Sequence, residues 1–140
     1  MSVTITRTDD FDTCLAIRTA VFVHEQGVPA EIENDEYDAG ATHLLALRDG
    51  KAVGTARIVQ KGDIGKIGRV CVLREERGTG LGAALINAAL DDMRNSDGFS
   101  KAILGAQIVA IPFYEKLGFT AYGDDFEDAG IAHRMMERTL

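Results

Sequence analysis

Hydrophobic and polar residues alternate at the start of the chain and then change to a helical period. Residues 3–6 alternate in the way expected of a β-strand. Asp9 and Asp10 can cap a helix, and the apolar positions between 11 and 22 recur at helical spacing. Gly27 and Pro29 are expected to end that helix.

Three apolar runs then follow one another with short turns between them. Residues 41–48 and 51–59 flank Asp49-Gly50, a pair that is typical of a tight β-hairpin. A second turn at 62–63 leads into the run 65–73. This pattern predicts an antiparallel meander in the first half of the chain.

The second half returns to helical spacing. Apolar positions between 81 and 93 share one helix face, which predicts a long helix. A strand at 101–104 and a short helix that Gly118 ends come next. The runs 119–122 and 131–137 predict two last strands, so the order of elements fits a mixed α/β sheet with helices packed on it.

Composition agrees with one globular domain over residues 1–140. Of the 140 residues, 46% are hydrophobic and 26% are charged, which is ordinary globular composition. The chain has neither an apolar run of about 20 residues nor the apolar stretch of a signal peptide, so we expect a cytoplasmic protein. Cys14 and Cys71 form no C-x-x-C pair, and a zinc or redox site is not supported.

The net charge of −7 narrows the choice of partners. Nucleic-acid binding needs a basic face, so we expect no nucleic-acid partner, and the lack of a spanning segment argues against a membrane partner. An acidic surface tolerates a cationic amine as substrate, because it attracts one.

The segment that says most about function is the glycine-rich segment 77–83, which follows a predicted strand and begins a predicted helix. Alternating glycines let backbone N–H groups point into one concavity, and a helix N-terminus adds partial positive charge. Such a turn suits a pyrophosphate. A P-loop would need Lys followed by Ser or Thr after the last glycine, where Ala83 and Ala84 stand. A dinucleotide fold would need the glycines directly after the strand and an acidic residue about 20 positions on, and neither is present.

Residues 77–82 and 110–119 each resemble a motif of the GNAT superfamily of N-acetyltransferases. The first, Arg-Gly-Thr-Gly-Leu-Gly, is similar to R/Q-x-x-G-x-G/A, and the second, Ala-Ile-Pro-Phe-Tyr-Glu-Lys-Leu-Gly-Phe, to A-x-x-F-Y-E-K-L-G-F. Their separation and the preceding meander also match. Residues 21–29, 41–43 and 130–133 are similar to a narrower ElaA/YjcF-like group of small bacterial GNAT proteins.

This resemblance implies the GNAT acyl-CoA N-acyltransferase fold, a mixed central sheet of about six to seven strands flanked by about four helices. It also implies acetyl-CoA as co-substrate, with no metal. Within the expected cofactor site, 70–72 would lie along the pantetheine arm, 78–83 would hold the pyrophosphate, and Gln107 stands where many relatives have asparagine. The residues implied for the cofactor are Val70, Cys71, Val72, Arg77, Gly78, Thr79, Gly80, Leu81, Gly82, Ala83, Gln107 and Tyr114.

The implied reaction is direct attack of a primary amine, on a small molecule or a protein, on the acetyl thioester. Tyr114 matches the family tyrosine near the thioester sulfur and would protonate the leaving thiolate. Glu25 is our predicted base, and the other candidates are Glu36, Asp38, His43 and His133. Cys71 as a covalent nucleophile has no base beside it in the sequence.

Three points stay open at this stage. The acidic run 31–38 lacks the spacing of a calcium loop and is expected to be a loop or short helix, solvated or facing the substrate. A homodimer is possible. The alternative function is an acetyl-CoA-binding sensor or partner module that transfers nothing.

Overall fold

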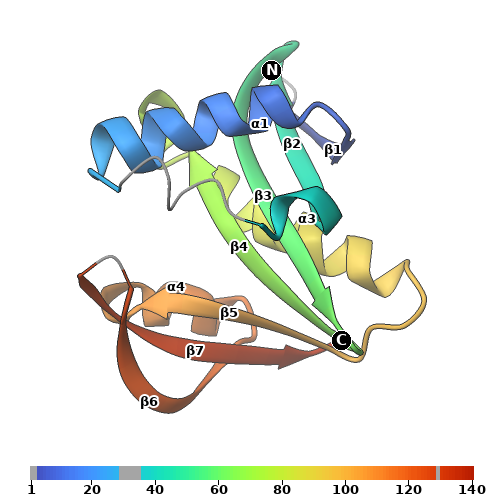
Figure 1. The fold of residues 1–140 in the computed structure, drawn as a ribbon, viewed down its shortest axis with the longest axis vertical. Coiled ribbons are helices and arrows are strands. Elements are labelled where there is room, and N and C mark those ends of the chain that lie inside the picture. The colour runs from blue at the N-terminus through green and yellow to red at the C-terminus, as the bar shows by residue number, and fades with distance from the viewer. Residues whose placement is uncertain (1–2, 29–35, 129) are drawn as a thin grey trace.

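The strands of the protein form one seven-stranded sheet in the order β1-β2-β3-β4-β5-β7-β6 (Figure 1). The computed structural model describes residues 3–28, 36–128 and 130–140, and most of the acidic run 31–38 lies outside them. The strands are β1 (Val3–Thr8), β2 (Thr42–Arg48), β3 (Lys51–Lys61), β4 (Ile64–Val72), β5 (Lys101–Gln107), β6 (Thr120–Asp128) and β7 (Ile131–Thr139).

The predicted meander is confirmed as β2, β3 and β4, which pair antiparallel in sequence order. Its first turn has the backbone that the sequence predicts, because Asp49 and Gly50 both have positive φ, 52° and 84°. That combination belongs to the type I′ turn, whose twist matches a tight hairpin.

The strands β4 and β5 pair in parallel, and their pairing is short. Ile64, Gly65 and Lys66 pair with Lys101, Ala102 and Ile103, and the paired register goes no further. The register between β3 and β4 shifts between Thr55 and Arg57, and the extra residue of this bulge is on β4. The bulge includes Arg69, whose φ is +51°. Such a bulge bends the strand that carries it, so β4 turns away from β5. Figure 1 shows the two strands together at one end and apart at the other.

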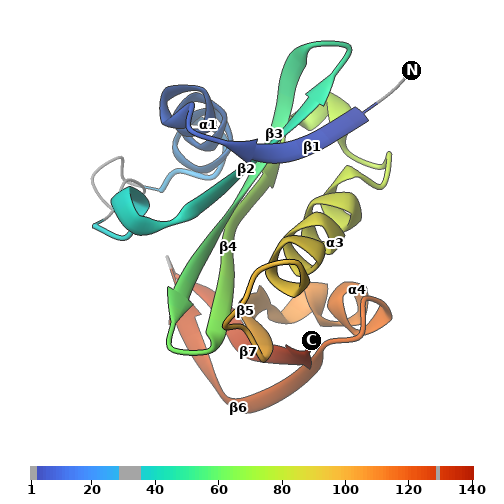
Figure 2. The same cartoon turned by 90° about the vertical axis from the view of Figure 1, so that its right-hand side faces the viewer.

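Helices cover both faces of the sheet (Figure 2). On one face lie α1 (Phe11–Arg18) and the π-helix η1 (Thr19–Glu25) that continues it. Asp10 caps α1 as predicted, since its carboxylate accepts a hydrogen bond from the Thr13 N–H at 3.2 Å. On the other face lie α3 (Leu81–Arg94) and α4 (Ile111–Lys116).

Each face of the sheet has its own apolar core. The larger core joins α3 to the central strands and includes Leu85, Ile86 and Met93, each with no exposed side chain. The smaller core joins α1 to the same strands through Cys14, Ile17, Val21, Leu45 and Cys71. The central strands are therefore buried on both sides, as expected for a sheet with helices on two faces.

The prediction of about four helices is corrected to three α-helices within the described part of the chain, namely α1, α3 and α4. The π-helical continuation of α1 was not foreseen, because a change of hydrogen-bonding pattern leaves the apolar spacing nearly unchanged. The strand count of seven and the mixed sheet agree with the predicted fold class.

A charged cluster is buried beside the smaller core. Asp38 accepts hydrogen bonds from the Arg18 guanidinium at 2.8 Å and from Arg57 at 3.1 Å. Arg18 is 1% exposed and Asp38 is 7% exposed. Burial alone would raise the pKa of Asp38, but the hydrogen bonds and charges of Arg18 and then Arg57 outweigh it and lower that pKa to about 2. These ion pairs therefore connect α1 and β3 to the turn before β2.

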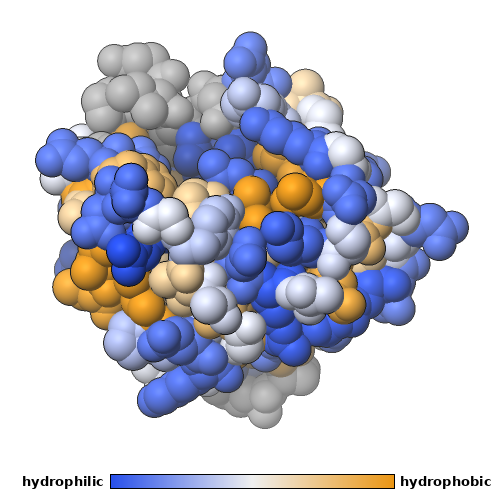
Figure 3. Space-filling view, turned by 90° about the horizontal axis from the view of Figure 1, so that it is seen from below, coloured by the Kyte–Doolittle hydropathy of each residue, from blue (hydrophilic) through white to orange (hydrophobic). Residues whose placement is uncertain are grey.

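The surface is mixed in character. On the face seen from below, hydrophilic side chains separate the apolar patches (Figure 3). Among the described residues, none of the helices has the length and apolar character needed to cross a bilayer.

We predict that Asp38→Asn lowers the free energy of unfolding at pH 7 by about 3–5 kcal/mol, since it removes a buried negative charge that accepts hydrogen bonds from Arg18 and Arg57. Because the folded pKa of Asp38 lies below its ordinary value of 3.8, this stabilisation is full above that value. It should disappear as the pH falls from about 4 to about 2. Denaturant unfolding followed by circular dichroism across this pH range measures both effects.

The matched control is Asp91→Asn, which removes a largely exposed carboxylate paired with Arg94 within one helix. That variant should change stability by less than about 0.5 kcal/mol. Equal effects of the two substitutions would contradict the structural role given to Asp38.

Candidate active site

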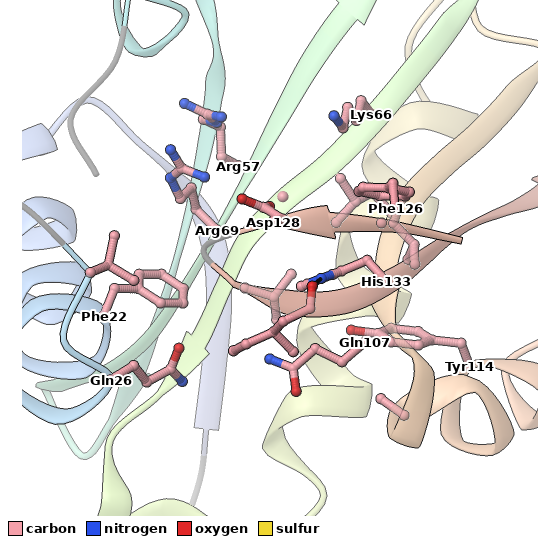
Figure 4. Close-up of a pocket in the computed structure, with 18 of the residues that line it drawn as sticks. Phe22, Gln26, Arg57, Lys66, Arg69, Gln107, Tyr114, Phe126, Asp128 and His133 are labelled. Atoms are coloured by element: carbon pink, nitrogen blue, oxygen red, sulfur yellow. Dashed lines mark hydrogen bonds between the residues drawn. The ribbon is translucent and has the colours of Figure 1, made fainter. Parts of the chain in front are cut away.

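A cavity of about 840 Å³ opens where β4 and β5 diverge. One wall comes from β3 and β4, the opposite wall from β5, β6 and β7, and the end of η1 closes one side (Figure 4). The polar and aromatic side chains that line it are Phe22, Gln26, Arg57, Lys66, Arg69, Gln107, Tyr114, Phe126, Asp128 and His133. The cavity thus follows directly from the short β4–β5 pairing.

A second, smaller cavity of about 280 Å³ lies at the glycine-rich segment. Gly78 and Gly80 have φ of +80° and +84°, a backbone that side chains other than glycine rarely adopt. Gly80 is the N-cap of α3 and supplies no side-chain hydrogen bond to the helix, so the first N–H groups of α3 face this hollow. The residues can therefore hold an anionic group by backbone N–H donation and the helix dipole.

The strand β4 and the helix α4 each contribute residues to both cavities. Val70 lines the larger one and Val72 the smaller one, and both belong to β4. In the same way Tyr114 lines the larger cavity and its neighbour Phe113 the smaller one. An extended ligand could therefore lie along β4, with a phosphate end at the glycine loop and its other end in the larger cavity.

Tyr114 lies on α4 with its hydroxyl end toward the larger cavity and Gln107 (Figure 4). Its ring packs edge-on against Phe113 and Phe119, with ring centroids 5.0 and 6.2 Å away. Burial raises the pKa of Tyr114 above its ordinary value of 10. The hydroxyl therefore keeps its proton at neutral pH and can donate it.

The residues predicted to bind the cofactor fall into two groups, those whose side chains or backbone line a cavity and those that do not. Most line one of the cavities, the larger at Val70, Gln107 and Tyr114 and the smaller at Val72, Arg77, Gly78, Gly80, Leu81, Gly82 and Ala83. Cys71 is buried in the core under α1, and Thr79 donates a hydrogen bond from its hydroxyl to the Glu76 carbonyl at 2.6 Å. Neither of these two side chains lines a cavity.

Glu25, the predicted base, lies on η1 in an ion pair with Arg77. One carboxylate oxygen accepts from a guanidinium nitrogen at 2.8 Å, and the same nitrogen donates to the Val72 carbonyl at 3.2 Å. The Arg77 hydrogen bond lowers the pKa of Glu25. Arg77 thereby joins the end of η1 to the end of β4, and Glu25 is not among the residues that line the larger cavity.

The four other base candidates are placed very differently. Asp38 is held in the buried arginine cluster, and His43 is buried with its Nε2 2.9 Å from the Asp38 carbonyl oxygen. Glu36 is exposed and lies outside both cavities. His133 lines the larger cavity from β7.

Several cavity residues were not predicted from the sequence. Arg57, Lys66 and Arg69 come from the strands of the meander, where their spacing looks like that of any exposed charge on a sheet. Phe126 and Asp128 lie on β6, which extends six residues beyond the run expected from its apolar pattern. The glycine at 130, with φ of +78°, was the available signal for a hairpin at that position.

No group of three or more histidine, cysteine, aspartate or glutamate residues suited to a metal ion occurs in the described segments.

Comparison with known proteins identifies the class of fold. A family model for the acetyltransferase (GNAT) domain matches residues 8–140. The uncharacterized N-acetyltransferase YjcF of Bacillus subtilis is 41% identical over 121 residues, which cover 86% of each chain. The crystal structure of Escherichia coli ElaA has a TM-score of 0.86 at 27% identity, covering 98% of this chain and 99% of that one.

An acyl-CoA N-acyltransferase from Pseudomonas aeruginosa gives a TM-score of 0.83 at 30% identity, with 98% of both chains covered. The chain therefore belongs to the GNAT acetyltransferase family, in the subgroup that includes ElaA and YjcF. Acyl transfer from an acyl-CoA is the chemistry of this family, and the two cavities along β4 suit such a donor.

Proposed function

We propose that this protein transfers the acetyl group of acetyl-CoA to a primary amine by direct attack, in the cytoplasm. The observation that carries the proposal is the line from the glycine loop along β4 to Tyr114. A pyrophosphate at the N-terminus of α3 would place the pantetheine arm beside β4 and the thioester in the larger cavity.

The chemistry asks three things of the site. The amine must give up a proton, the oxygen of the thioester carbonyl must be stabilised as it becomes negative, and the sulfur must leave. The amine nitrogen forms a bond to the carbonyl carbon, the C–S bond breaks, and the thiolate takes the Tyr114 proton. Backbone N–H groups of β4 beside the cavity are the proposed donors to the oxyanion.

The cavity lining supports a reaction between two molecules. Its volume of about 840 Å³ lies within the range of about 300–1,000 Å³ found for small-molecule sites. A donor lying along β4 would leave the walls formed by η1 and β6–β7 unoccupied. An acceptor amine, on a small molecule or a protein terminus, would enter from that side. A chain that only bound acetyl-CoA as a sensor would release no thiol with any amine.

We predict that Gly80→Asp weakens acetyl-CoA binding at least tenfold. A Cβ built at Gly80 has open space around it, but the φ of +84° strains any side chain placed there. The carboxylate adds a negative charge beside the phosphates, and comparison with an uncharged variant of the same shape separates this charge effect from the strain. Calorimetry measures the affinity, and circular dichroism checks the fold.

Gly80→Asn is the matched control, because it has the same shape and the same tolerance for positive φ but no charge. It should bind acetyl-CoA several-fold more tightly than the aspartate variant. Equal affinity for the aspartate variant and the wild type would contradict the proposed phosphate site.

We predict that Tyr114→Phe lowers kcat at least tenfold with little change in acetyl-CoA affinity. Loss of general acid catalysis typically costs about 100- to 10,000-fold, and water can replace the phenol in part. The phenyl ring would keep its packing on Phe113 and Phe119. Thiol release from acetyl-CoA against a panel of amines measures the rate.

Tyr122→Phe provides the control, since Tyr122 is exposed on β6 and lines neither cavity. It should keep the wild-type rate. A Tyr114→Phe rate within a factor of about two of wild type would show that Tyr114 only packs.

A further inference from the structure

One histidine of the larger cavity is held in a single tautomer. The Nδ1 of His133 lies 2.7 Å from the carbonyl oxygen of Ile131. A carbonyl oxygen can only accept, so Nδ1 carries the hydrogen in this contact. In the neutral ring Nε2 is then unprotonated and holds a lone pair that can take a proton.

The ring of His133 is also fixed in direction. It stacks on Phe126 across the β6–β7 hairpin, with ring centroids 5.7 Å apart and 27° between the ring planes. On the other side of β7, His133 stands opposite Gln107 of β5 in the strand register. Figure 4 shows the ring in the cavity between β4 and the residues Gln107 and Tyr114.

The other groups that the sequence offered as a base lie in different surroundings. Asp38 is paired with two buried arginines, His43 has its Nε2 on a backbone carbonyl, and Glu25 is paired with Arg77. All five candidates lie in the described part of the chain, and of these five His133 lines the larger cavity.

Resting on the proposed acetyl transfer, we propose that His133 is the catalytic base that takes the proton from the acceptor amine at Nε2. The nitrogen gives one proton to Nε2 as it forms the bond to the carbonyl carbon. The C–S bond breaks, and its electron pair goes to sulfur, which takes the Tyr114 proton. Water then carries a proton from the His133 imidazolium to the Tyr114 phenolate, which restores both groups.

The proposed base and the proposed acid come from different elements of the fold. His133 comes from β7 and Tyr114 from α4, and both border the cavity at the place where Gln107 ends β5. A base on the acceptor side and an acid on the sulfur side do not compete for one proton. The donor would arrive along β4, which leaves the hairpin side of the cavity to the amine.

The first test is His133→Asn, in which the side-chain amide N–H can keep the hydrogen bond to the Ile131 carbonyl while the basic nitrogen is lost. We expect kcat for the best amine of the panel to fall at least tenfold. The affinity for acetyl-CoA should stay within twofold of wild type, and the melting temperature should stay within a few degrees. His133→Gln serves as a second variant if the asparagine variant is unstable. A rate within twofold of wild type in a folded variant would overturn the proposal.

Two parallel variants test whether the loss of rate is specific to His133. His24→Gln removes an exposed histidine on η1 that lies outside both cavities, and it should keep the wild-type rate. Glu25→Gln tests the competing base, and we expect it to raise the KM for acetyl-CoA more than it lowers kcat, because Arg77 loses its partner at the cofactor loop. A large loss of kcat in Glu25→Gln alone would assign the base to Glu25.

The pH profile of kcat/KM gives a readout that a packing role would not move. A base must be unprotonated to accept the amine proton, so kcat/KM of the wild type should fall toward acidic pH. In His133→Asn this dependence should be lost, with a low and flatter profile. The other charged or titratable groups that line the cavity are Arg57, Lys66, Arg69, Tyr114 and Asp128.

The outcomes also separate this inference from the proposed function. Failure of the wild type to release thiol with any amine, despite binding acetyl-CoA, would overturn acetyl transfer and the base with it. Active wild type with an unaffected His133→Asn variant would overturn the base alone. An unchanged pH profile in a slow His133→Asn variant would show that His133 only positions the hairpin.

Discussion

The divergence of β4 from β5 is the constraint on which the rest of the site depends. A parallel pair that stops after three residues leaves a wedge that no neighbouring strand fills. The cause is local, because the bulge at Arg69 bends β4, whereas β5 pairs with β7 from Lys101 to Gln107. The apolar cores on both faces hold the wedge open, since neither strand can shift toward the other without breaking the packing against α1 or α3.

Charge is distributed so that an acidic protein can hold an anionic donor. The chain carries a net charge of −7, yet the glycine loop offers backbone N–H groups and the positive end of α3. These partial charges act at short range, where the phosphates would be, whereas the net charge acts over the whole surface and is screened by salt. Arg77 lines the same hollow, and its ion pair with Glu25 fixes the direction of its guanidinium.

The parts predicted from the sequence are those that local rules determine. The Asp49-Gly50 turn, the Asp10 cap and the helix that begins after Gly80 follow from backbone preferences of single residues, and the structure has all three. The insertion of β7 between β5 and β6 could not be predicted, because apolar alternation does not say which strand is the neighbour. The same limit applies to the five base candidates, because the sequence does not say which side chains share a cavity.

What distinguishes His133 is the contact it makes with its own strand. An imidazole without a fixed partner can exchange tautomers, and only one of them presents a lone pair to a substrate at Nε2. The Ile131 carbonyl selects that tautomer, and the Phe126 ring limits rotation of the imidazole. Both contacts lie within the β6–β7 hairpin, so the hairpin itself sets the orientation of the proposed base. In the proposed reaction, the hairpin that was hardest to place from the sequence would therefore border the acceptor, while the two motifs that resemble the family would border the donor.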